Sequence, residues 1–368
     1  MKTLGIVFSN IYDDFFGEMT RNRTVASLPF GGRYRLIDFV LSNMSNSGIY
    51  QVGLITKYNY RSLMDHLGSC AEWDLNRKNE RLVLLPPFAS GNTGVYKGKL
   101  EALYSAEQFI EDNKYDYVVM SDCTVLCNID YKPAIEEHIK SGADITVITT
   151  PFSKGKHPLT VIANKKKRVT EIELDSEAKE GASIGTGMFI ISRKLLSEAI
   201  SEAHSKGYVH FERDFIQKRF NDNKLTVNMY QFDGVVLRNE SISQYLANNL
   251  SLTDKKIRDG LFLPERPIYT KVRDEHPTYF GKGASLEHCI VADGCTLNGK
   301  AINSVLFRNV VLENNCTVKN SMILQGSIIG AGSKLENVIL DMDVVISPET
   351  ELKGTPEHPV IISKGAAV

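Results

Sequence analysis

Two patterns of apolar and polar positions divide the chain. Up to about Tyr245, short β-branched runs alternate with stretches in which apolar residues recur three and four positions apart. This alternation is typical of an α/β domain with a largely parallel sheet. It predicts buried strands at residues 4–8, 51–56, 117–120 and 144–149, and helices at 34–47 and 100–113. We expect residues 1–248 to form a doubly wound domain that binds ligands where its strands end, after Phe8 and Met120.

From about His276 onward the helical periodicity ends, and short apolar runs recur every 16 to 17 residues. The runs lie at residues 289–291, 305–307, 322–324 and 338–340, with Gly, Asn and Asp between them. A fixed period of short strands indicates a β-solenoid, here with about three hexapeptides per coil. A β-sandwich with evenly spaced strands is the alternative. We assign residues 276–368 to the solenoid and the charged residues 249–275 to a linker.

Composition narrows the function classes. The chain has 43 Lys and Arg against 44 Asp and Glu, and no basic stripe with interleaved aromatics, which argues against nucleic acid as a partner. No apolar run approaches the roughly 18 residues of a membrane span, and the apolar run at residues 1–8 is too short for a signal peptide. We therefore expect no membrane association and a cytoplasmic location. The six cysteines are scattered without a C-x-x-C pair, so neither a zinc site nor a redox motif is predicted.

The most specific motif of the chain is residues 28–43, LPFGGRYRLIDFVLSN, followed by residues 46–49, NSGI. On this motif, and on matches at residues 71–77 and 130–131, the chain resembles the bacterial glucose-1-phosphate adenylyltransferases over nearly its whole length. The resemblance implies a GT-A-like Rossmann-type nucleotidyltransferase domain followed by a left-handed parallel β-helix of hexapeptide-type repeats. It also implies the family reaction of glycogen biosynthesis, in which ATP and glucose 1-phosphate give ADP-glucose and pyrophosphate with magnesium.

The phosphate-binding loop of that family has no counterpart here. Nucleotidyl transfer needs cations and close backbone N–H groups around a triphosphate, and the family supplies them in Ala-Gly-Gly-x-Gly-x-Arg-Leu after its first strand. Counted back without a gap from the motif, these positions are residues 9–16, SNIYDDFF. The arginine position is Phe15. Asp13 and Asp14 are expected to place two carboxylates beside the phosphates, which they would repel.

The metal and sugar-phosphate positions of the family are also replaced. The first metal aspartate aligns with Thr124, although a local gap would bring Asp122 there, and the second aligns with Asn239. The lysine that meets glucose 1-phosphate aligns with Asp175, and the threonine of a Gly-Thr-Ala segment aligns with Lys99. We expect neither metal nor cofactor in this chain, with magnesium held by a catalytic partner. The resemblance thus implies no catalytic residue, only vestigial positions at Phe15, Thr124, Asp175 and Asn239.

Three arginines, Arg23, Arg33 and Arg35, flank the intact Pro-Phe-Gly-Gly segment. The family positions that match Arg23 and Arg35 contribute to binding phosphorylated effectors between the two domains. A planar guanidinium that is always charged suits phosphate, so the three arginines are candidates for effector binding. Salt bridges at a domain or subunit interface are the alternative.

The replaced positions suggest a regulatory role. The chain resembles the non-catalytic D-type subunit of Gram-positive bacteria, which implies a catalytic glucose-1-phosphate adenylyltransferase subunit as partner in a homo- or hetero-tetramer. Two other hypotheses stay open. The chain could be a weakly active sugar-phosphate nucleotidyltransferase in which Asp122 and Asp130 hold the metal, or a free-standing sensor of sugar phosphates or nucleotides.

Overall fold

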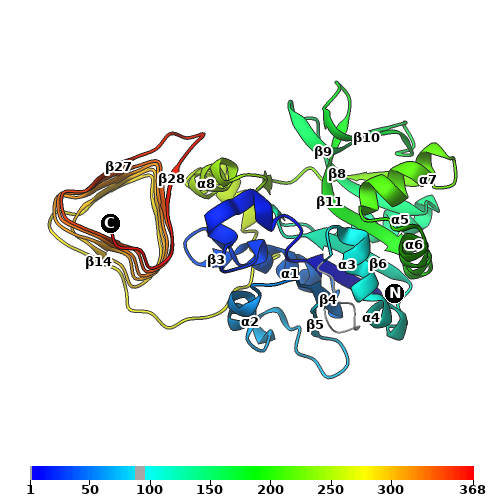
Figure 1. Ribbon diagram of the computed structural model, residues 1–368, viewed down its shortest axis with the longest axis horizontal. Helices are drawn as coiled ribbons and strands as arrows, with labels where there is room; N and C mark the ends of the chain where they lie inside the picture. The colour runs from blue at the N-terminus through cyan, green and yellow to red at the C-terminus, as the bar shows by residue number, and fades with distance from the viewer. Residues whose placement is uncertain (1, 88–95) are drawn as a thin grey trace.

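The structure is a computed structural model that describes residues 2–87 and 96–368. Figure 1 shows an α/β domain formed by the first part of the chain and, beside it, a triangular β-helix formed by the last part. The α/β domain begins with β1 (Thr3–Phe8), and the β-helix begins with β14 (Tyr279–Phe280). The residues predicted as a linker contain the end of α8 (Ile242–Ser251) and the whole of α9 (Lys255–Leu261).

In the described part of the chain, the α/β domain is built on a nine-stranded sheet with the order β10-β9-β11-β6-β1-β4-β5, to which β8 and β12 are joined through β11. The strands β6, β1, β4 and the edge strand β5 run parallel, and the buried apolar runs predict the first three of them. Beyond β6 the prediction of a largely parallel sheet is only partly right. There β12 runs parallel to β8, but β11 runs antiparallel to β6, β8 and β9, and β10 runs antiparallel to β9. The strand bounds are β4 Val52–Ile55, β5 Leu82–Leu85, β6 Tyr117–Asp122, β8 Ile145–Thr150, β9 Lys156–Ala163, β10 Val169–Glu177, β11 Ser183–Ser192 and β12 Val227–Gln231.

Helices cover both faces of this sheet, as expected for a doubly wound domain. Apolar residues of α3, α4 and α6 pack on one face, and those of α1, α2 and α5 on the other. The predicted helix at 100–113 is divided at Ala106 into α3 and α4. The helix bounds are α1 Leu36–Asn46, α2 Arg61–Leu67, α3 Lys99–Ser105, α4 Glu107–Asp112, α5 Tyr131–Ser141, α6 Arg193–Lys206 and α7 Lys218–Asn221.

Short polar side chains fix where several helices begin. The side chains of Asp130, Ser192 and Ser241 accept a backbone N–H in the first turns of α5, α6 and α8. This is the usual N-cap arrangement, in which a side-chain oxygen satisfies a backbone donor that has no partner in the helix. The other short elements are β2 Pro29–Phe30, β3 Tyr34–Arg35, β7 Val125–Cys127, β13 Val236–Arg238, the 3₁₀ segments η1 Asp13–Thr20, η2 Val25–Ser27 and η3 Ala71–Trp73, and the π-helical η4 Phe211–Gln217.

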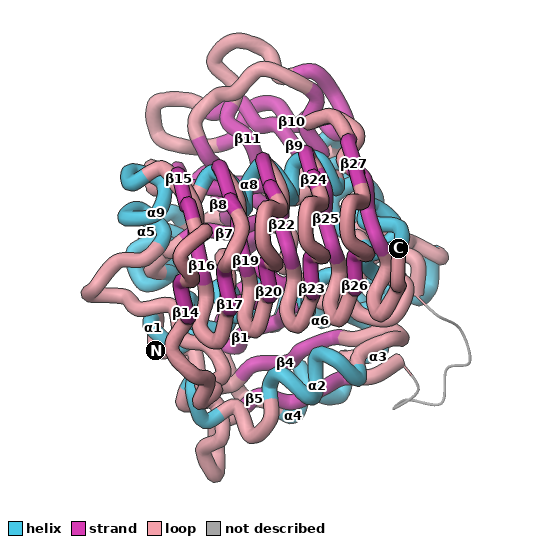
Figure 2. Tube along the Cα trace, turned by 90° about the vertical axis from the view of Figure 1, so that its left-hand side faces the viewer, coloured by secondary structure: helices cyan, strands magenta, loops and turns pink. Residues whose placement is uncertain are grey.

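The last part of the chain is a left-handed β-helix, which confirms the predicted solenoid and excludes the β-sandwich. In the described residues its strands form three parallel sheets of five strands. The sheets are the three sides of the triangle in Figure 1, and Figure 2 shows the coils stacked side by side. The apolar runs seen in the sequence are the strands of a single side. That side comprises β16 Ile290–Val291, β19 Val305–Leu306, β22 Met322–Ile323, β25 Val338–Leu340 and β28 Val360–Ile362.

The three sides of the β-helix differ in what they present outward. On the side just described, Val305, Met322 and Ile339 pack in one cluster with Tyr245 of α8, which joins the two domains. This contact explains why the sequence shows consecutive apolar residues there. The second side carries charged residues outward and comprises β15 Ser285–Glu287, β18 Lys300–Ile302, β21 Thr317–Lys319, β24 Lys334–Glu336 and β27 Glu351–Lys353.

The third side is the sheet of β14, β17 (Thr296–Leu297), β20 (Val311–Leu312), β23 (Ile328–Ile329) and β26 (Val345–Ile346). Its outward positions are in register from strand to strand, and the last three are Val311, Ile328 and Val345. Ile328 is 39% exposed and Val345 44% exposed. We call these three residues the apolar ladder.

Among the described residues, no helix has the length and apolar character to cross a bilayer.

Candidate functional site

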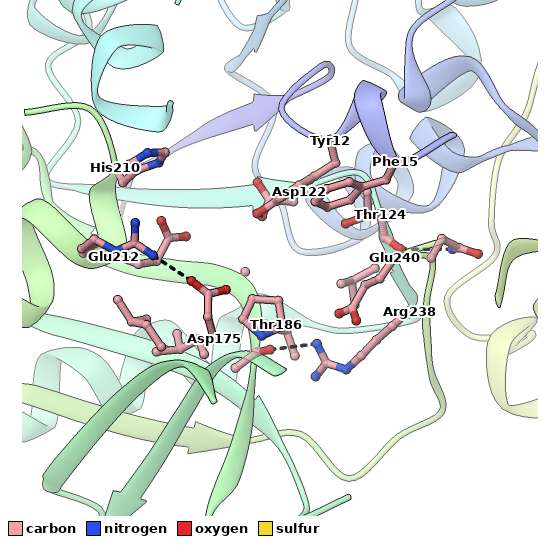
Figure 3. A pocket seen from close by; sticks show the side chains of 18 residues that line it. Tyr12, Phe15, Asp122, Thr124, Asp175, Thr186, His210, Glu212, Arg238 and Glu240 are labelled. Atoms are coloured by element: carbon pink, nitrogen blue, oxygen red, sulfur yellow. Dashed lines mark hydrogen bonds and ion pairs between the residues drawn. The ribbon is translucent and has the colours of Figure 1, made fainter. Parts of the chain in front are cut away.

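A pocket of about 260 Å³ lies where β1 and β6 end, at the sheet edge where the sequence predicts ligand binding (Figure 3). Phe8 and Asp122, the last residues of these two parallel strands, are paired in register. All four predicted vestigial residues line this pocket, so the fold brings them together. The lining residues are Tyr12, Phe15, Asp122, Thr124, Val125, Pro158, Leu159, Leu174, Asp175, Gly185, Thr186, Gly187, His210, Glu212, Arg213, Arg238, Asn239 and Glu240.

The segment after β1 folds into the 3₁₀ segment η1 and not into an open glycine loop. Phe16 and Met19 of η1 are buried in the apolar cluster between the two domains. The carboxylate of Asp13 accepts the backbone N–H of Val25 at 2.8 Å and the side-chain amide of Asn10 at 2.6 Å. These contacts fix the segment against the protein interior.

The expectation for Asp13 and Asp14 is wrong, because neither residue lines the pocket. Asp13 is 5% exposed, and its carboxylate is directed to Asn10 and Val25. Burial raises the pKa of Asp13 to about 6, although both hydrogen bonds oppose this effect. The sequence could not show the direction of this side chain, which depends on the turn that η1 makes.

Aromatic rings stand where the resemblance places a catalytic cation. Phe15 is 54% exposed, and its ring stacks on Tyr12 with 5.7 Å between the centroids. Figure 3 shows both rings at the wall of the pocket. An aromatic ring cannot neutralise a phosphate, so this wall offers surface for packing and no positive charge.

Three charged side chains meet at the inner end of the pocket. The Lys99 ammonium lies 2.8 Å from Oδ2 of Asp122 and 2.5 Å from Oε1 of Glu212. The hydroxyl of Tyr12 donates a hydrogen bond to the same Asp122 oxygen at 3.2 Å. Burial disfavours the charged amine, but attraction to Asp122 and Glu212 outweighs burial and raises the pKa of Lys99 well above its ordinary value. Sequence reasoning noted Lys99 as a replacement but missed Glu212, which lies 113 residues away.

Thr124 and Asn239, aligned with the two metal aspartates, are in direct contact. The amide of Asn239 donates to the backbone oxygen of Thr124 at 3.0 Å, and Oδ1 of Asn239 accepts from Asn248 at 3.0 Å. Asn239 is fully buried. Its amide is therefore used at both ends within the protein, and neither it nor Thr124 supplies the anionic oxygen that magnesium prefers.

The side of the pocket where the resemblance places the sugar phosphate contains an ion pair at the surface. Asp175 accepts a hydrogen bond of 2.7 Å from Arg213, and both side chains are 55% exposed. Arg238, which the sequence analysis did not select, donates to the backbone oxygen of Gly185 at 2.8 Å. Asp214 accepts two backbone N–H groups at the start of η4, where it acts as a local cap.

A second, smaller pocket lies at the junction of the two domains and contains Arg33 and Arg35. Arg35 donates to the backbone oxygen of Ser62 at 2.6 Å, and burial lowers its pKa to about 10. Burial, with repulsion from Arg273 and Arg33, also lowers the pKa of Arg308. None of the described residues that line this pocket is acidic. They are Pro29, Gly32, Arg33, Tyr34, Arg35, His66, Lys271, Arg273, Phe307, Arg308, Gln325 and Met342.

Arg23 lies apart from this pocket. Its guanidinium donates two hydrogen bonds, of 2.8 and 2.7 Å, to the carboxylate of Asp341 in the β-helix. The two side chains are 5% and 4% exposed. The candidate role for Arg23 in effector binding is therefore corrected. Its charge is already matched inside the protein, in the salt bridge between domains that was the alternative.

Comparison of the sequence with known proteins shows which family this chain belongs to. The profile of nucleotidyl transferases matches residues 17–234, and that of the GlmU-like C-terminal hexapeptide domain matches residues 276–358. The glycogen biosynthesis protein GlgD of Bacillus subtilis (strain 168) is 33% identical over 99% of this chain and 96% of its own length. GlgD of Geobacillus stearothermophilus is 35% identical, also over 99% of this chain and 96% of its own length. Glucose-1-phosphate adenylyltransferase of Clostridium perfringens (strain 13 / Type A) is 30% identical over 85% of this chain and 81% of that protein.

The chain belongs to the glucose-1-phosphate adenylyltransferase family. This confirms the resemblance drawn from residues 28–43 and the two-domain fold that it implied.

Magnesium does not fit the pocket of this family member. The described residues contain no group of three or more His, Cys, Asp or Glu side chains placed to hold a metal. Thr124 and Asn239 are neutral, and the Oδ2 atom of Asp122 is engaged by Lys99. The alternative ligand Asp130 accepts the backbone N–H of Lys132 and acts as the N-cap of α5.

The charges around this family member's pocket also differ from those that nucleotidyl transfer needs. The lining includes four carboxylates, of Asp122, Asp175, Glu212 and Glu240, and two guanidiniums, of Arg213 and Arg238. Even with the Lys99 ammonium added, negative charge exceeds positive charge. The described lining therefore has no excess of positive charge to stabilise a triphosphate.

Proposed function

We propose that this chain is a catalytically deficient, regulatory subunit of glucose-1-phosphate adenylyltransferase in bacterial glycogen biosynthesis. One observation carries the proposal. The segment after β1 is the folded segment η1, which presents Tyr12 and Phe15 to the pocket where nucleotidyl transfer needs backbone donors and a cation. The names of relatives support the part of the proposal that concerns glycogen biosynthesis, because two relatives that match 99% of the chain are called glycogen biosynthesis protein GlgD.

Several independent deficits support the absence of catalysis. Removing one positioned donor or cation from such a site typically costs about 10² to 10³ in rate. Here the glycine loop, both anionic metal ligands and the lysine for the sugar phosphate are all replaced. The weakly active alternative is disfavoured, because Asp122 is paired with Lys99 and Asp130 caps α5.

A subunit that does not catalyse the reaction acts through contact with an active subunit. The β-helix offers a surface for such a contact. The apolar ladder of Val311, Ile328 and Val345 is in register and points outward. Matching positions on the adjacent side are Thr317, Lys334 and Glu351. We assign the apolar ladder to contact with an active adenylyltransferase subunit in a hetero-tetramer. An allosteric coupling of about 1–3 kcal/mol across such a contact changes the partner's substrate affinity by about 5 to 150-fold.

The pocket at the domain junction supports the proposal that this chain binds a phosphorylated effector. Arg33, Arg35, Lys271, Arg273 and Arg308 line it, without an acidic lining residue in the described part of the chain. Nε of Arg308 is buried without a hydrogen-bond partner there. The only salt bridge that Arg308 makes in the described residues is a long one, 3.9 Å from its Nε to Oδ2 of Asp293, and closely spaced guanidinium groups suit a phosphate. Since the pocket contains residues of both domains, a bound phosphate would bias how the domains pack.

Two measurements test the proposed function. The purified chain should form no ADP-glucose from ATP and glucose 1-phosphate with magnesium. When it is mixed with an active adenylyltransferase subunit, light scattering after size exclusion should show a hetero-oligomer, and kcat should rise or KM should fall. ADP-glucose synthesis by the chain alone would refute the proposal. Separate elution with unchanged kinetics would favour the free-standing sensor.

A further inference from the structure

A buried ionic cluster at the inner end of the first pocket joins three distant parts of the chain. Lys99 is the first residue of α3, Asp122 is the last residue of β6, and Glu212 lies in η4. The Lys99 and Asp122 side chains are only 4% and 3% exposed, and Glu212 is 22% exposed. A lysine this deeply buried is uncommon and needs anionic partners.

The fold brings the two carboxylates to one point, so the cluster requires a cation. A carboxylate oxygen of Asp122 and one of Glu212 both lie within 2.8 Å of the Lys99 nitrogen. Without this ammonium, the buried Asp122 carboxylate and the partly exposed Glu212 carboxylate would repel each other. Backbone packing holds Asp122 in place. A Cβ atom added at Gly187, where φ is +75°, would lie only 2.4 Å from Asp122 Oδ2.

One atom of the cluster has no hydrogen-bond partner. Oδ1 of Asp122 is buried without one in the described residues, while Oδ2 is shared by Lys99 and Tyr12. An unpartnered buried carboxylate oxygen is costly, and it is the kind of hard ligand that a divalent cation binds. The Asp122 carboxylate thus keeps one oxygen that the ammonium does not use.

The surroundings of Lys99 favour an ammonium over a hydrated metal ion. Its nitrogen lies 5.8 Å from the ring centroid of Phe8, 6.0 Å from that of Tyr12 and 5.4 Å from that of Phe189. Aromatic faces attract a compact cation but supply no oxygen ligand. The native pocket therefore holds its positive charge on the protein itself.

We propose that Lys99 is a resident cation that occupies the place of a divalent ion between Asp122 and Glu212. The inference rests on the proposed function, since it explains how the pocket of a silent subunit excludes a metal-bound nucleotide. The ammonium repels the metal, and the carboxylates around it repel the phosphates. Removal of the lysine charge should expose a latent site for divalent cations.

The test is a Mn²⁺ titration of the full chain and of Lys99→Thr, followed by the electron paramagnetic resonance signal of free Mn²⁺ and by thermal unfolding. We expect Lys99→Thr to bind Mn²⁺ about tenfold or more tightly than the native chain, because a cation no longer competes for the carboxylates. Mn²⁺ should raise the Tm of the variant and leave that of the native chain unchanged. Lys97→Thr, at an exposed position two residues away, is the matched control and should behave like the native chain.

Two further variants allow a clear result even if Lys99→Thr folds poorly. Lys99→Gln retains a long polar side chain and should show the same gain if Lys99→Thr folds poorly. Addition of Asp122→Asn to either variant should abolish the gain. Equal Mn²⁺ binding by native chain and variants, or a gain that survives Asp122→Asn, would overturn the proposal. So would failure of both lysine variants to fold with and without Mn²⁺, because a divalent ion then does not replace the lysine.

Failure of this inference and failure of the proposed function are distinguishable. ADP-glucose synthesis by the native chain would refute the silent subunit, whatever the Mn²⁺ titrations show. Unchanged Mn²⁺ binding in Lys99→Thr, with a native chain that is inactive alone, would refute only the role of Lys99.

Discussion

Arg23 and Asp341 form a buried ion pair between the two domains. The guanidinium donates two hydrogen bonds, of 2.8 and 2.7 Å, across 318 residues of sequence. Arg23 follows η1, and Asp341 follows β25 of the β-helix. The pair therefore ties the segment that forms the pocket wall to the domain junction.

Removing one member of this pair should destabilise the protein strongly. Arg23→Met leaves the Asp341 carboxylate buried without its partner, a loss that costs about 3–5 kcal/mol in free energy of unfolding. Urea denaturation measures the loss. Arg21→Met is the matched control, because Arg21 is 72% exposed and its replacement should cost at most about 0.5 kcal/mol. Equal stability of the two variants would show that the Arg23 pair contributes nothing.

The sequence was sufficient for the repeating parts of this fold and insufficient for its long-range ion pairs. Periodicity predicts the parallel centre of the sheet and the β-helix, because both follow from local alternation of apolar residues. The partners of Arg23 and Lys99 could not be predicted, since Asp341 and Glu212 lie far away in the chain. The antiparallel course of β11 likewise depends on how distant segments meet.

At the vestigial positions, too, the sequence predicts some features of the site and not others. Residue identities at Phe15, Thr124, Asp175 and Asn239 were enough to predict the loss of charge, and all four line one pocket. The direction of Asp13 was not predictable, because η1 turns its carboxylate toward Val25. Nor could sequence show that Lys99 supplies a cation of its own to the pocket.

Asn239→Asp should leave the chain inactive and make it less stable. The Asn239 amide donates to the backbone oxygen of Thr124 at 3.0 Å, and an aspartate would place a buried carboxylate against that oxygen. We expect a loss of about 1–3 kcal/mol in unfolding free energy and no ADP-glucose synthesis. Asn221→Asp, at an exposed position of α7, is the control.

Phe15→Arg alone should also stay inactive, because the other deficits remain. Activity in either variant would show that the site is less degraded than proposed.

Stability should depend on pH through Asp13. The pKa of Asp13 is raised from 3.8 to about 6 in the folded protein, so the folded state binds this proton more tightly than the unfolded state. The resulting contribution is fully present below about pH 4 and is lost as pH rises through about 6, by up to about 3 kcal/mol. Urea denaturation across this range should give a steeper decline for the native chain than for Asp13→Asn. Asp14→Asn removes only the smallest of the effects that raise the pKa of Asp13, so it should change the profile much less than Asp13→Asn does. Parallel profiles for all three proteins would contradict the assignment.

Arg33→Gln should weaken binding of phosphate compounds at the domain junction. The guanidinium lines a pocket whose described lining residues include no acid, and a lost charge-assisted hydrogen bond costs about 1.5–3 kcal/mol. Calorimetric titration with inorganic phosphate and with a sugar bisphosphate should show affinity reduced about tenfold or more. Arg21→Gln removes a positive charge at the surface and should have little effect. Equal losses in both variants would indicate only a general electrostatic attraction.

Ile328→Lys should prevent association with an active adenylyltransferase subunit. Ile328 is the middle residue of the apolar ladder, and a charge buried there on association would lose its water without gaining a partner. Truncation or charging of a central contact residue typically costs 2 kcal/mol or more, which is about a thirtyfold weaker complex.

Thr317→Lys places the same charge at an outward position on the adjacent, charged side, so it is a matched control for net charge and for the β-helix fold. Size exclusion with light scattering measures association, and steady-state kinetics of the mixture measures coupling. Loss of both in Ile328→Lys, with both retained in Thr317→Lys, would locate the contact on the ladder. If both variants associate as the native chain does, the active subunit binds elsewhere.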